Sequence, residues 1–174
     1  MLTQAQLMEK IRDVPDFPQA GIMFKDITPL LADAQAFYSA VDYMAEQYRG
    51  QDISTVVAIE ARGYLFGAPL AHHLECGFVP IRKVGKLPWR TIKEEYALEY
   101  GSATIEMHLD SLVAGQRVVI VDDVLATGGT LAAAAKLVEQ SGAKVVGMAV
   151  LLELGFLNGR EKLKGYDIFS LLST

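Results

Sequence analysis

The chain has 174 residues, about the length of one globular domain, of which 51% are hydrophobic and 21% charged. Its net charge of −5 disfavours a general affinity for nucleic acid or for anionic membranes. Cys76 is the single cysteine, which excludes a disulfide within the chain, and no stretch approaches the roughly 20 apolar residues of a membrane span, so we expect a cytoplasmic protein.

The N-terminal part predicts two helices separated by an irregular segment. A capping box begins at Thr3 and apolar residues follow at helical spacing, so we expect a first helix that ends before Pro15. Prolines and glycines interrupt residues 15–29, where we expect a loop with a short edge strand. Asp33 is a suitable N-cap for a second helix, which Gly50 would end.

Five aliphatic runs in the rest of the chain predict strands, and helical segments separate several of them. This alternation is typical of an α/β protein with a doubly wound, mostly parallel sheet flanked by helices, which we expect as a single domain over residues 1–174. The runs are TVVAIE (55–60), FVPIRK (78–83), VVIVDD (118–123), KVVGMAVLLEL (144–154) and YDIFSLL (166–172).

One part of the chain does not fit this alternation. Residues 84–95 carry many charges without periodicity, and irregular segments of that length in compact domains are often lids. Residues 95–109 alternate apolar and polar side chains, as an antiparallel hairpin does. We therefore expect a flexible lid and an antiparallel flap at the side of the sheet over residues 84–109.

A candidate anion-binding loop follows the run VVIVDD. In open α/β sheets ligands bind beyond the carboxyl ends of the strands, and ATGGT (126–130) lies there, directly before a predicted helix. Its glycines allow backbone N–H groups to point inward, its threonines add hydroxyl donors, and the helix adds its positive end, so the loop suits a phosphomonoester. Asp122 and Asp123 would repel that phosphate, and they suit sugar hydroxyls or a metal ion instead. A ribose 5-phosphate offers a partner to each group.

The segment VVIVDDVLATGGT (118–130) is similar to the phosphoribosyl diphosphate signature of type I phosphoribosyltransferases. The resemblance covers nearly the whole chain and indicates the adenine-using branch of that family through FPQAGIMFKDITPLL, EARGYLFG, IRKVGKLP, YALEYG and LLELGFLNGREKL. It implies the type I phosphoribosyltransferase fold, with a small hood over residues 12–30, and a homodimer. It also implies purine salvage, in which the 5-phosphoribosyl group of 5-phospho-α-D-ribose 1-diphosphate is transferred to adenine, giving AMP and diphosphate. Mg²⁺ would be carried by the diphosphate substrate, with no direct protein ligand.

The resemblance also implies a role for each matching residue. Asp122 and Asp123 would hold the ribose hydroxyls, directly or through the water shell of Mg²⁺, and would stabilise the positive charge that develops on the ribose if they stay ionised. Glu99 would be the acid or base at adenine. The other implied substrate contacts are Phe24, Lys25 and Leu154 at adenine, Arg62, Arg82, Lys83 and Lys86 at the diphosphate, Tyr100 in the lid, and Ala126, Thr127, Gly128, Gly129 and Thr130 at the 5′-phosphate.

Three positions depart from the family pattern. Glu60 stands where other members carry aspartate, in a short diphosphate-contacting loop that often has an unusual peptide geometry. Lys25 stands where some members carry arginine, and Trp89 follows Pro88 where a small or charged residue is expected. Two alternatives remain open: a phosphoribosyltransferase for another base, such as hypoxanthine or guanine, and a regulator that senses phosphoribosyl diphosphate without catalysis. The negative net charge disfavours a DNA-binding regulator.

Overall fold

The computed structural model of the chain describes residues 1–98 and 101–174, and it divides into two compact units, Met1–Tyr43 and Met44–Thr174. The first unit contains two short helices, a two-stranded antiparallel sheet and the beginning of a longer helix. The carboxylate of Asp33 caps that longer helix, as expected, with a hydrogen bond of 3.0 Å from a first-turn N–H group. The elements are α1 (Gln4–Met8), β1 (Arg12–Pro15), β2 (Met23–Asp26), α2 (Thr28–Ala32) and α3 (Ala34–Tyr48), which continues into the second unit.

The first helix is shorter than the sequence predicted. Its expected capping box is present, because the side chain of Thr3 accepts a hydrogen bond of 3.3 Å from the N–H group of Gln6. However, α1 ends at Met8 rather than before Pro15. Residues 12–15 instead pair with β2, and this antiparallel pairing outweighs their helical spacing.

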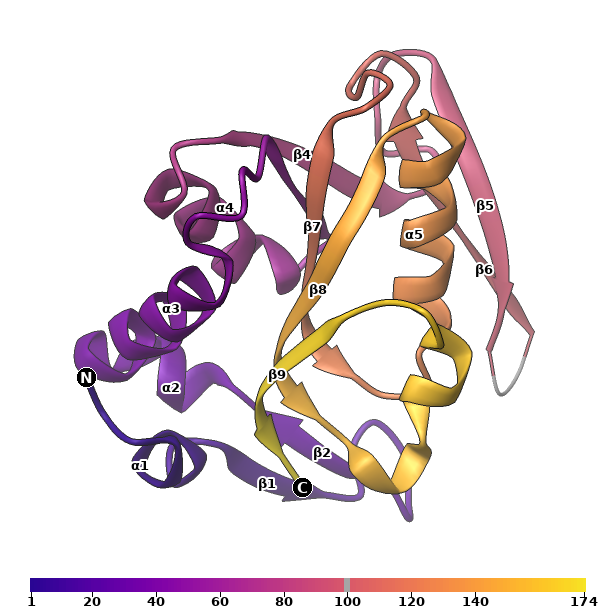
Figure 1. Ribbon diagram of the computed structural model, residues 1–174. Helices are drawn as coiled ribbons and strands as arrows, with labels where there is room; N and C mark the ends of the chain where they lie inside the picture. The colour runs from indigo at the N-terminus through magenta and orange to yellow at the C-terminus, as the bar shows by residue number, and fades with distance from the viewer. Residues whose placement is uncertain (99–100) are drawn as a thin grey trace. The chain divides into compact units, whose positions relative to one another are not determined.

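Within the described residues, the second unit is built around a seven-stranded sheet with the order β5-β6-β4-β3-β7-β8-β9 (Figure 1). Strands β4, β3, β7, β8 and β9 run parallel, β6 pairs antiparallel with β4, and β5 pairs antiparallel with β6. Each expected run forms a strand, and the predicted fold class is confirmed. The elements are β3 (Thr55–Ile59), α4 (Gly63–His73), β4 (Gly77–Lys83), β5 (Thr91–Ala97), β6 (Ser102–His108), β7 (Arg117–Leu125), α5 (Gly129–Gln140), β8 (Lys144–Glu153), the 3-10 helices η1 (Gly155–Leu157) and η2 (Gly159–Leu163), and β9 (Ile168–Ser173).

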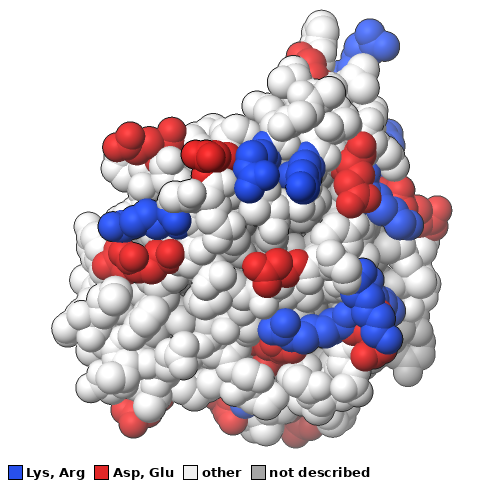
Figure 2. Space-filling view, in the orientation of Figure 1, with Lys and Arg blue, Asp and Glu red and all other residues white. Residues whose placement is uncertain are grey.

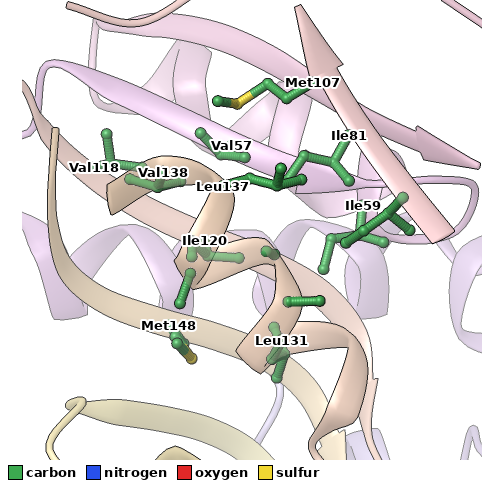
Figure 3. Packing of buried hydrophobic residues seen from close by; sticks show 14 of the residues in the cluster. Val57, Ile59, Ile81, Met107, Val118, Ile120, Leu131, Leu137, Val138 and Met148 are labelled. Carbon is green, nitrogen blue, oxygen red and sulfur yellow. The ribbon is translucent and has the colours of Figure 1, made fainter. Parts of the chain in front are cut away.

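Helices α4 and α5 cover opposite faces of this sheet (Figure 1). Successive side chains of a strand point to opposite faces, and β3 shows the division clearly. On one face α4 lies so near that a Cβ added to Gly67 would be 2.5 Å from the Cβ of Ala58. On the other face Val57 and Ile59 pack with Leu137 of α5 in one buried cluster (Figure 3). The doubly wound arrangement leaves the carboxyl ends of β4, β3, β7 and β8 side by side at one edge.

The hairpin of β5 and β6 confirms the predicted antiparallel flap and corrects the bounds of the segment before it. The hairpin extends one edge of the sheet, since β6 pairs with β4 and places Glu106 opposite Arg82. The irregular segment covers residues 84–90 rather than 84–95, because β5 already begins at Thr91. Exposed residues alternate with partly buried residues along β5, but several of both kinds are charged. The alternation of apolar and polar side chains that indicates a strand is therefore weak there.

Charged side chains are mixed on the surface. Figure 2 shows Lys and Arg side chains next to Asp and Glu side chains in small groups on the face viewed. Ion pairs between exposed side chains of the described residues include Arg49 with Glu46 at 2.8 Å and Lys164 with Glu161 at 2.6 Å. Over residues 1–98 and 101–174, the helices lack the length and hydropathy that a membrane-crossing helix needs.

Candidate active site

The predicted site residues of the second unit gather at the ends of four neighbouring parallel strands. Arg82 lies at the end of β4, and Glu60 directly follows β3. Asp122 and Asp123 lie near the end of β7, and Leu154 directly follows β8. Because these strands are adjacent in the order β4-β3-β7-β8, residues far apart in the sequence meet at one edge of the sheet.

The loop 126–130, called the cradle below, is built from backbone. Residues 124–131 line about 260 Å³ of open space. Gly128 has a φ of +79°, a left-handed conformation that glycine adopts without strain, and α5 begins at the next residue without a side-chain cap. The first N–H groups of a helix have no acceptor within the helix, so those of α5 are available to a bound anion. The predicted loop and the helix that follows it are therefore confirmed, and anion binding by the cradle stays a prediction.

A second segment packs closely against the cradle. A Cβ added to Gly128 would lie 2.3 Å from the carbonyl oxygen of Gly159, and one added to Gly159 would lie 2.2 Å from that of Ala126. Arg160 follows in η2 and donates two hydrogen bonds to Glu153 at the end of β8, at 2.8 and 2.7 Å. This charge-assisted pair holds η2 in place, and the two glycines let its backbone touch the backbone of the cradle.

Asp122 and Asp123 form a closely coupled acidic pair. Asp123 is only 5% exposed, and its N–H group donates to Oδ1 of Asp122 at 2.9 Å. Nε of Arg62 lies 2.8 Å from Oδ2 of Asp123, at ion-pair distance but without the angle of a hydrogen bond. Burial and then the charge of Asp123 raise the pKa of Asp122 well above its usual value. Burial also raises the pKa of Asp123, against the opposing effect of Arg62.

The raised pKa values bear on the predicted role of Asp122 and Asp123 at the ribose. Stabilisation of a cationic ribose requires charged carboxylates, whereas burial, and for Asp122 also the charge of Asp123, disfavours the charged form. Gly63, the first residue of α4, allows the close packing around them, since a Cβ there would lie 3.1 Å from Oδ1 of Asp122. The acidic pair therefore gains its charge most readily when a cationic partner is present.

Glu60 is the centre of a basic cluster formed by Arg82, Lys83 and Lys86. Nη2 of Arg82 donates to Oε1 of Glu60 at 2.8 Å, and Nζ of Lys86 donates to the same oxygen at 2.9 Å. Lys83 joins through its backbone N–H group, 3.1 Å from Oε2, and not through its ammonium group. The hydrogen bond from Arg82 is the largest of the effects that lower the pKa of Glu60 to about 2. The Glu60–Ala61 peptide bond is cis, in agreement with the unusual geometry expected of this loop.

Two further predicted residues, Phe24 and Lys25, lie on β2 in the first unit. The ring of Phe24 packs edge-to-face on Phe17 with a centroid distance of 5.1 Å. Nζ of Lys25 lies 2.6 Å from a carboxylate oxygen of Asp13. These contacts order both side chains within the first unit, and their roles at adenine stay predictions.

Leu154 and the two flap residues complete the predicted set. The N–H group of Leu154 donates to the carbonyl oxygen of Leu125 at 2.9 Å, so Leu154 lies beside the end of β7. Glu99 and Tyr100 lie outside the described residues, and their roles as acid or base and as lid residue stay predictions.

Sequence reasoning missed several residues that support the site. Gly159 lies within the matched segment LLELGFLNGREKL but was given no role, and Glu106 belongs to none of the matched segments. On β5, Tyr96 lies against the cradle: the hydroxyl of Thr130 donates to that of Tyr96 at 3.3 Å, and a Cβ added to Gly129 would be 3.3 Å from the Tyr96 ring. The alternation of β5 indicated a strand face for Tyr96, but its partners are distant in sequence, so no local signal could identify them.

The class of protein follows from this arrangement and from a comparison with known families. A family model described as the phosphoribosyl transferase domain matches residues 30–171, which is most of the chain. The chain belongs to the phosphoribosyltransferase family. The fold and the site agree with this assignment, since the cradle, the acidic pair and the basic cluster lie within the matched residues.

Two of the most similar relatives within this family are adenine phosphoribosyltransferases. The chain is 55% identical over 171 residues to the adenine phosphoribosyltransferase of Thermoanaerobacter sp. (strain X514), covering 98% of this chain and 99% of that protein. It is 57% identical over 166 residues to the enzyme of the same name from Roseiflexus castenholzii, covering 95% and 96% of the two chains.

Solved structures give the same result. The crystal structure of adenine phosphoribosyltransferase from Thermoanaerobacter pseudethanolicus has a TM-score of 0.96 at 54% identity and covers 99% of this chain and 100% of that chain. The Saccharomyces cerevisiae enzyme, in complex with an imino-altritol bisphosphate and adenine, has a TM-score of 0.92 at 40% identity, covering 97% of this chain and 98% of that chain. The branch of the family that this chain resembles is therefore that of the adenine phosphoribosyltransferases.

Proposed function

We propose that this chain catalyses adenine phosphoribosyl transfer: the 5-phosphoribosyl group passes from 5-phospho-α-D-ribose 1-diphosphate to adenine, and AMP and diphosphate are released. The observation that carries the proposal is the juxtaposition of cradle, acidic pair and basic cluster at adjacent strand ends. A ribose carrying a 5-phosphate and a 1-diphosphate needs these three partners. The similarity to adenine phosphoribosyltransferases over nearly the whole chain supports the choice of base.

The cradle residues Ala126–Thr130 bind the 5′-phosphate in this proposal. The positive end of α5, with its uncapped N–H groups, stabilises the dianion, and the hydroxyls of Thr127 and Thr130 add donors. The backbone of Gly159 packs closely on Gly128 and supports the loop from one side. Binding at this end fixes the ribose over the neighbouring acidic pair, and orientation of this kind is a large part of catalysis.

Asp122 and Asp123 act on the ribose. Their carboxylates accept hydrogen bonds from the ribose hydroxyls, and they stabilise the positive charge that develops on the sugar as its bond to diphosphate breaks. A cationic partner favours the charged form of a carboxylate, so the raised pKa values of the ligand-free pair fall as that charge develops. Arg62 lies beside Oδ2 of Asp123 and keeps that carboxylate oxygen oriented.

Arg82, Lys86 and Arg62 receive the leaving diphosphate. The two side chains that now share Glu60 carry the positive charge that the departing group needs. Their partly exposed positions leave the charges accessible, at 35% exposure for Arg82 and 48% for Lys86. Lys83 contributes through its exposed side chain on the same segment.

Mg²⁺ is the cofactor in this proposal. The described residues hold no group of three or more His, Cys, Asp or Glu side chains arranged as a metal site. The acidic pair fits a hydrated ion that is bound mainly by substrate, because Mg²⁺ prefers carboxylate oxygens and retains several waters, and Oδ2 of Asp123 accepts no hydrogen bond. When bound, the ion neutralises charge on the diphosphate.

Adenine recognition rests on the resemblance. Phe24, Lys25 and Leu154 are proposed to contact the base, Glu99 to exchange its ring proton and Tyr100 to position the lid. We further propose a homodimer in the cytoplasm.

The test is the formation of AMP from adenine and 5-phospho-α-D-ribose 1-diphosphate with Mg²⁺, followed chromatographically. Parallel reactions use the same enzyme stock with hypoxanthine or guanine in place of adenine. We expect AMP with adenine and at most traces of product with the other bases. Product with another base but not with adenine would contradict the choice of base, and binding of the diphosphate substrate without any product would favour a sensor.

A further inference from the structure

Glu106, on β6, is a buried carboxylate that the proposed reaction does not use. It is 2% exposed, and its Oε1 accepts hydrogen bonds from three consecutive backbone N–H groups, those of Gly85 at 2.8 Å and of Lys86 and Leu87 at 3.1 Å. Its Oε2 accepts a hydrogen bond of 3.0 Å from the hydroxyl of Thr91. Successive N–H groups that converge on one oxygen form an anion-binding nest, and here the anion belongs to the protein itself.

Burial decides what this nest can do. An exposed nest could exchange its carboxylate for an anion of the substrate, but the carboxylate of Glu106 is almost fully enclosed. Displacing it would leave a buried charge without its four hydrogen bonds, which is strongly unfavourable. Burial alone would raise the pKa of Glu106, but the hydrogen bonds from Leu87, Thr91, Gly85 and Lys86 outweigh it and lower the pKa. Glu106 is therefore a buried carboxylate anchor of residues 85–87.

The anchored turn carries a cation of the basic cluster. Lys86 is held by Glu106 at its N–H group, by Nη1 of Arg82 at its carbonyl oxygen (3.1 Å) and by Glu60 at its ammonium group. Arg82 itself lies opposite Glu106 in the pairing of β4 with β6. The position of the turn, and with it the separation of the two positive charges, thus depends on a residue of the hairpin.

We infer that Glu106 is a positioning residue for diphosphate recognition: it fixes the turn Gly85–Leu87 so that Lys86 and Arg82 present their charges together. The inference rests on the proposed function and deepens it. Glu106 does not contact the substrate, because its oxygens are enclosed by protein donors. The chemical group that depends on it is a diphosphate, either as the leaving group or as part of the intact substrate.

The test compares the affinities of two ligands by titration calorimetry, using inorganic diphosphate with Mg²⁺ and AMP. We expect Glu106→Ala to weaken diphosphate binding about tenfold or more, while AMP, held by the cradle and the acidic pair, changes by less than about twofold. Glu106→Gln should restore most of the affinity, because its amide oxygen can accept from the nest and its amide nitrogen can donate to Thr91.

A second variant changes the backbone donors of the nest instead of the carboxylate, in case Glu106→Ala fails to fold. Gly85 has a φ of +87° and open space around an added Cβ, so Gly85→Ala strains the nest without displacing any neighbour. It should show the same selective loss. Gly115→Ala is the matched control, since Gly115 has a φ of +84° and equally open surroundings away from the site.

Two results would overturn the inference: unchanged diphosphate affinity in Glu106→Ala and Gly85→Ala, or an equal loss of diphosphate and AMP affinity, which would indicate general damage. Failure of the proposed function appears elsewhere, in a wild-type chain that forms no AMP from adenine. The two hypotheses therefore fail in separate experiments.

Discussion

The cradle and the basic cluster lie at the ends of neighbouring strands, yet different forces hold them. Backbone packing fixes the cradle, where Gly128 and Gly159 approach so closely that neither tolerates a Cβ. Carboxylates fix the basic cluster, where Glu60 and Glu106 bind its side chains and its backbone. Packing responds little to pH or salt, whereas charge pairs respond to both. The two halves of the site can therefore be disturbed separately.

The acidic pair beside the cradle and the carboxylates of the basic cluster differ in the direction of their pKa shifts. The pKa values of Asp122 and Asp123 are raised, chiefly by burial, although the charge of Arg62 opposes the rise. Those of Glu60 and Glu106 are lowered by hydrogen bonds to their charged form. The hydrogen bonds of the basic cluster thus favour the charged carboxylates, whereas burial disfavours the charged form of the acidic pair even beside Arg62. Burying two carboxylates in this way costs stability, and such a cost is typical of residues that are retained for function.

The largest effect is expected from Gly128→Ala, which attacks the packing of the cradle. The substitution imposes a left-handed conformation on a residue with a Cβ and forces that atom to within 2.3 Å of the Gly159 oxygen. We expect activity to fall below detection and unfolding free energy to drop by roughly 3 kcal/mol, from backbone strain plus overpacking. The measurements are kcat/KM and urea denaturation. Gly165→Ala is the control, with a φ of +100° and no atom within 4 Å, so it should keep full activity.

The next effect, from Asp123→Asn, removes a charge but no volume. We expect kcat to fall about 10²- to 10³-fold with the fold intact, since a single well-placed stabilising group is worth that much in a preorganised site. Steady-state kinetics and circular dichroism would check this. Asp110→Asn, at an exposed position, should leave both unchanged. Turnover within threefold of wild type would contradict the role assigned to Asp123.

The cradle could be predicted from its own residues, whereas the basic cluster could not. The cradle and the acidic pair are contiguous, so VVIVDDVLATGGT alone predicted a strand, a turn and a helix, which the structure confirms, and an anion site, which stays a prediction. Arg62, Arg82 and Lys86 were predicted as site residues through the resemblance alone, and the structure places them around Glu60 and Asp123. The long aliphatic strands were predicted correctly because their signal, like that of the cradle, lies in one contiguous stretch of sequence.

What the sequence could not reveal depends on partners that are distant along the chain. Glu106 reads as one polar position of an alternating strand, and only the pairing of β6 with β4 brings it to the turn at residues 85–87. Gly159 reads as a turn glycine until its backbone meets the cradle. The residues Arg12–Pro15 look helical by the spacing of their apolar side chains, yet they form a strand because they pair with β2. Tertiary contacts decide such cases, not local propensity.

A smaller effect, on stability alone, should sharpen the contrast in pKa. The raised pKa of Asp122 means that the folded chain binds its proton more tightly than the unfolded chain. Stability from this group is therefore full at low pH and is lost as pH rises above about 4 through the folded pKa. Asp122→Asn removes the dependence, so its unfolding free energy relative to wild type should increase with pH. Urea denaturation from about pH 4.5 to 8.5 measures the trend, and a pH-independent difference would contradict it.

The smallest effect, from Glu60→Gln, should have the opposite dependence on pH. The pKa of Glu60 is lowered to about 2, so its contribution is full above its unfolded value of 4.5 and is lost as pH falls toward about 2. At neutral pH the variant should lose about 1 kcal/mol, because Arg82 and Lys86 are one-third to one-half exposed and water screens the pairs. Urea denaturation should show this loss shrinking in acid and in high salt, whereas Glu161→Gln, which breaks a pair whose carboxylate side chain is 69% exposed, should show little loss at any pH. A loss that persists unchanged at about pH 3 would mean that Glu60 acts by packing, and the basic cluster would then be held in the same way as the cradle.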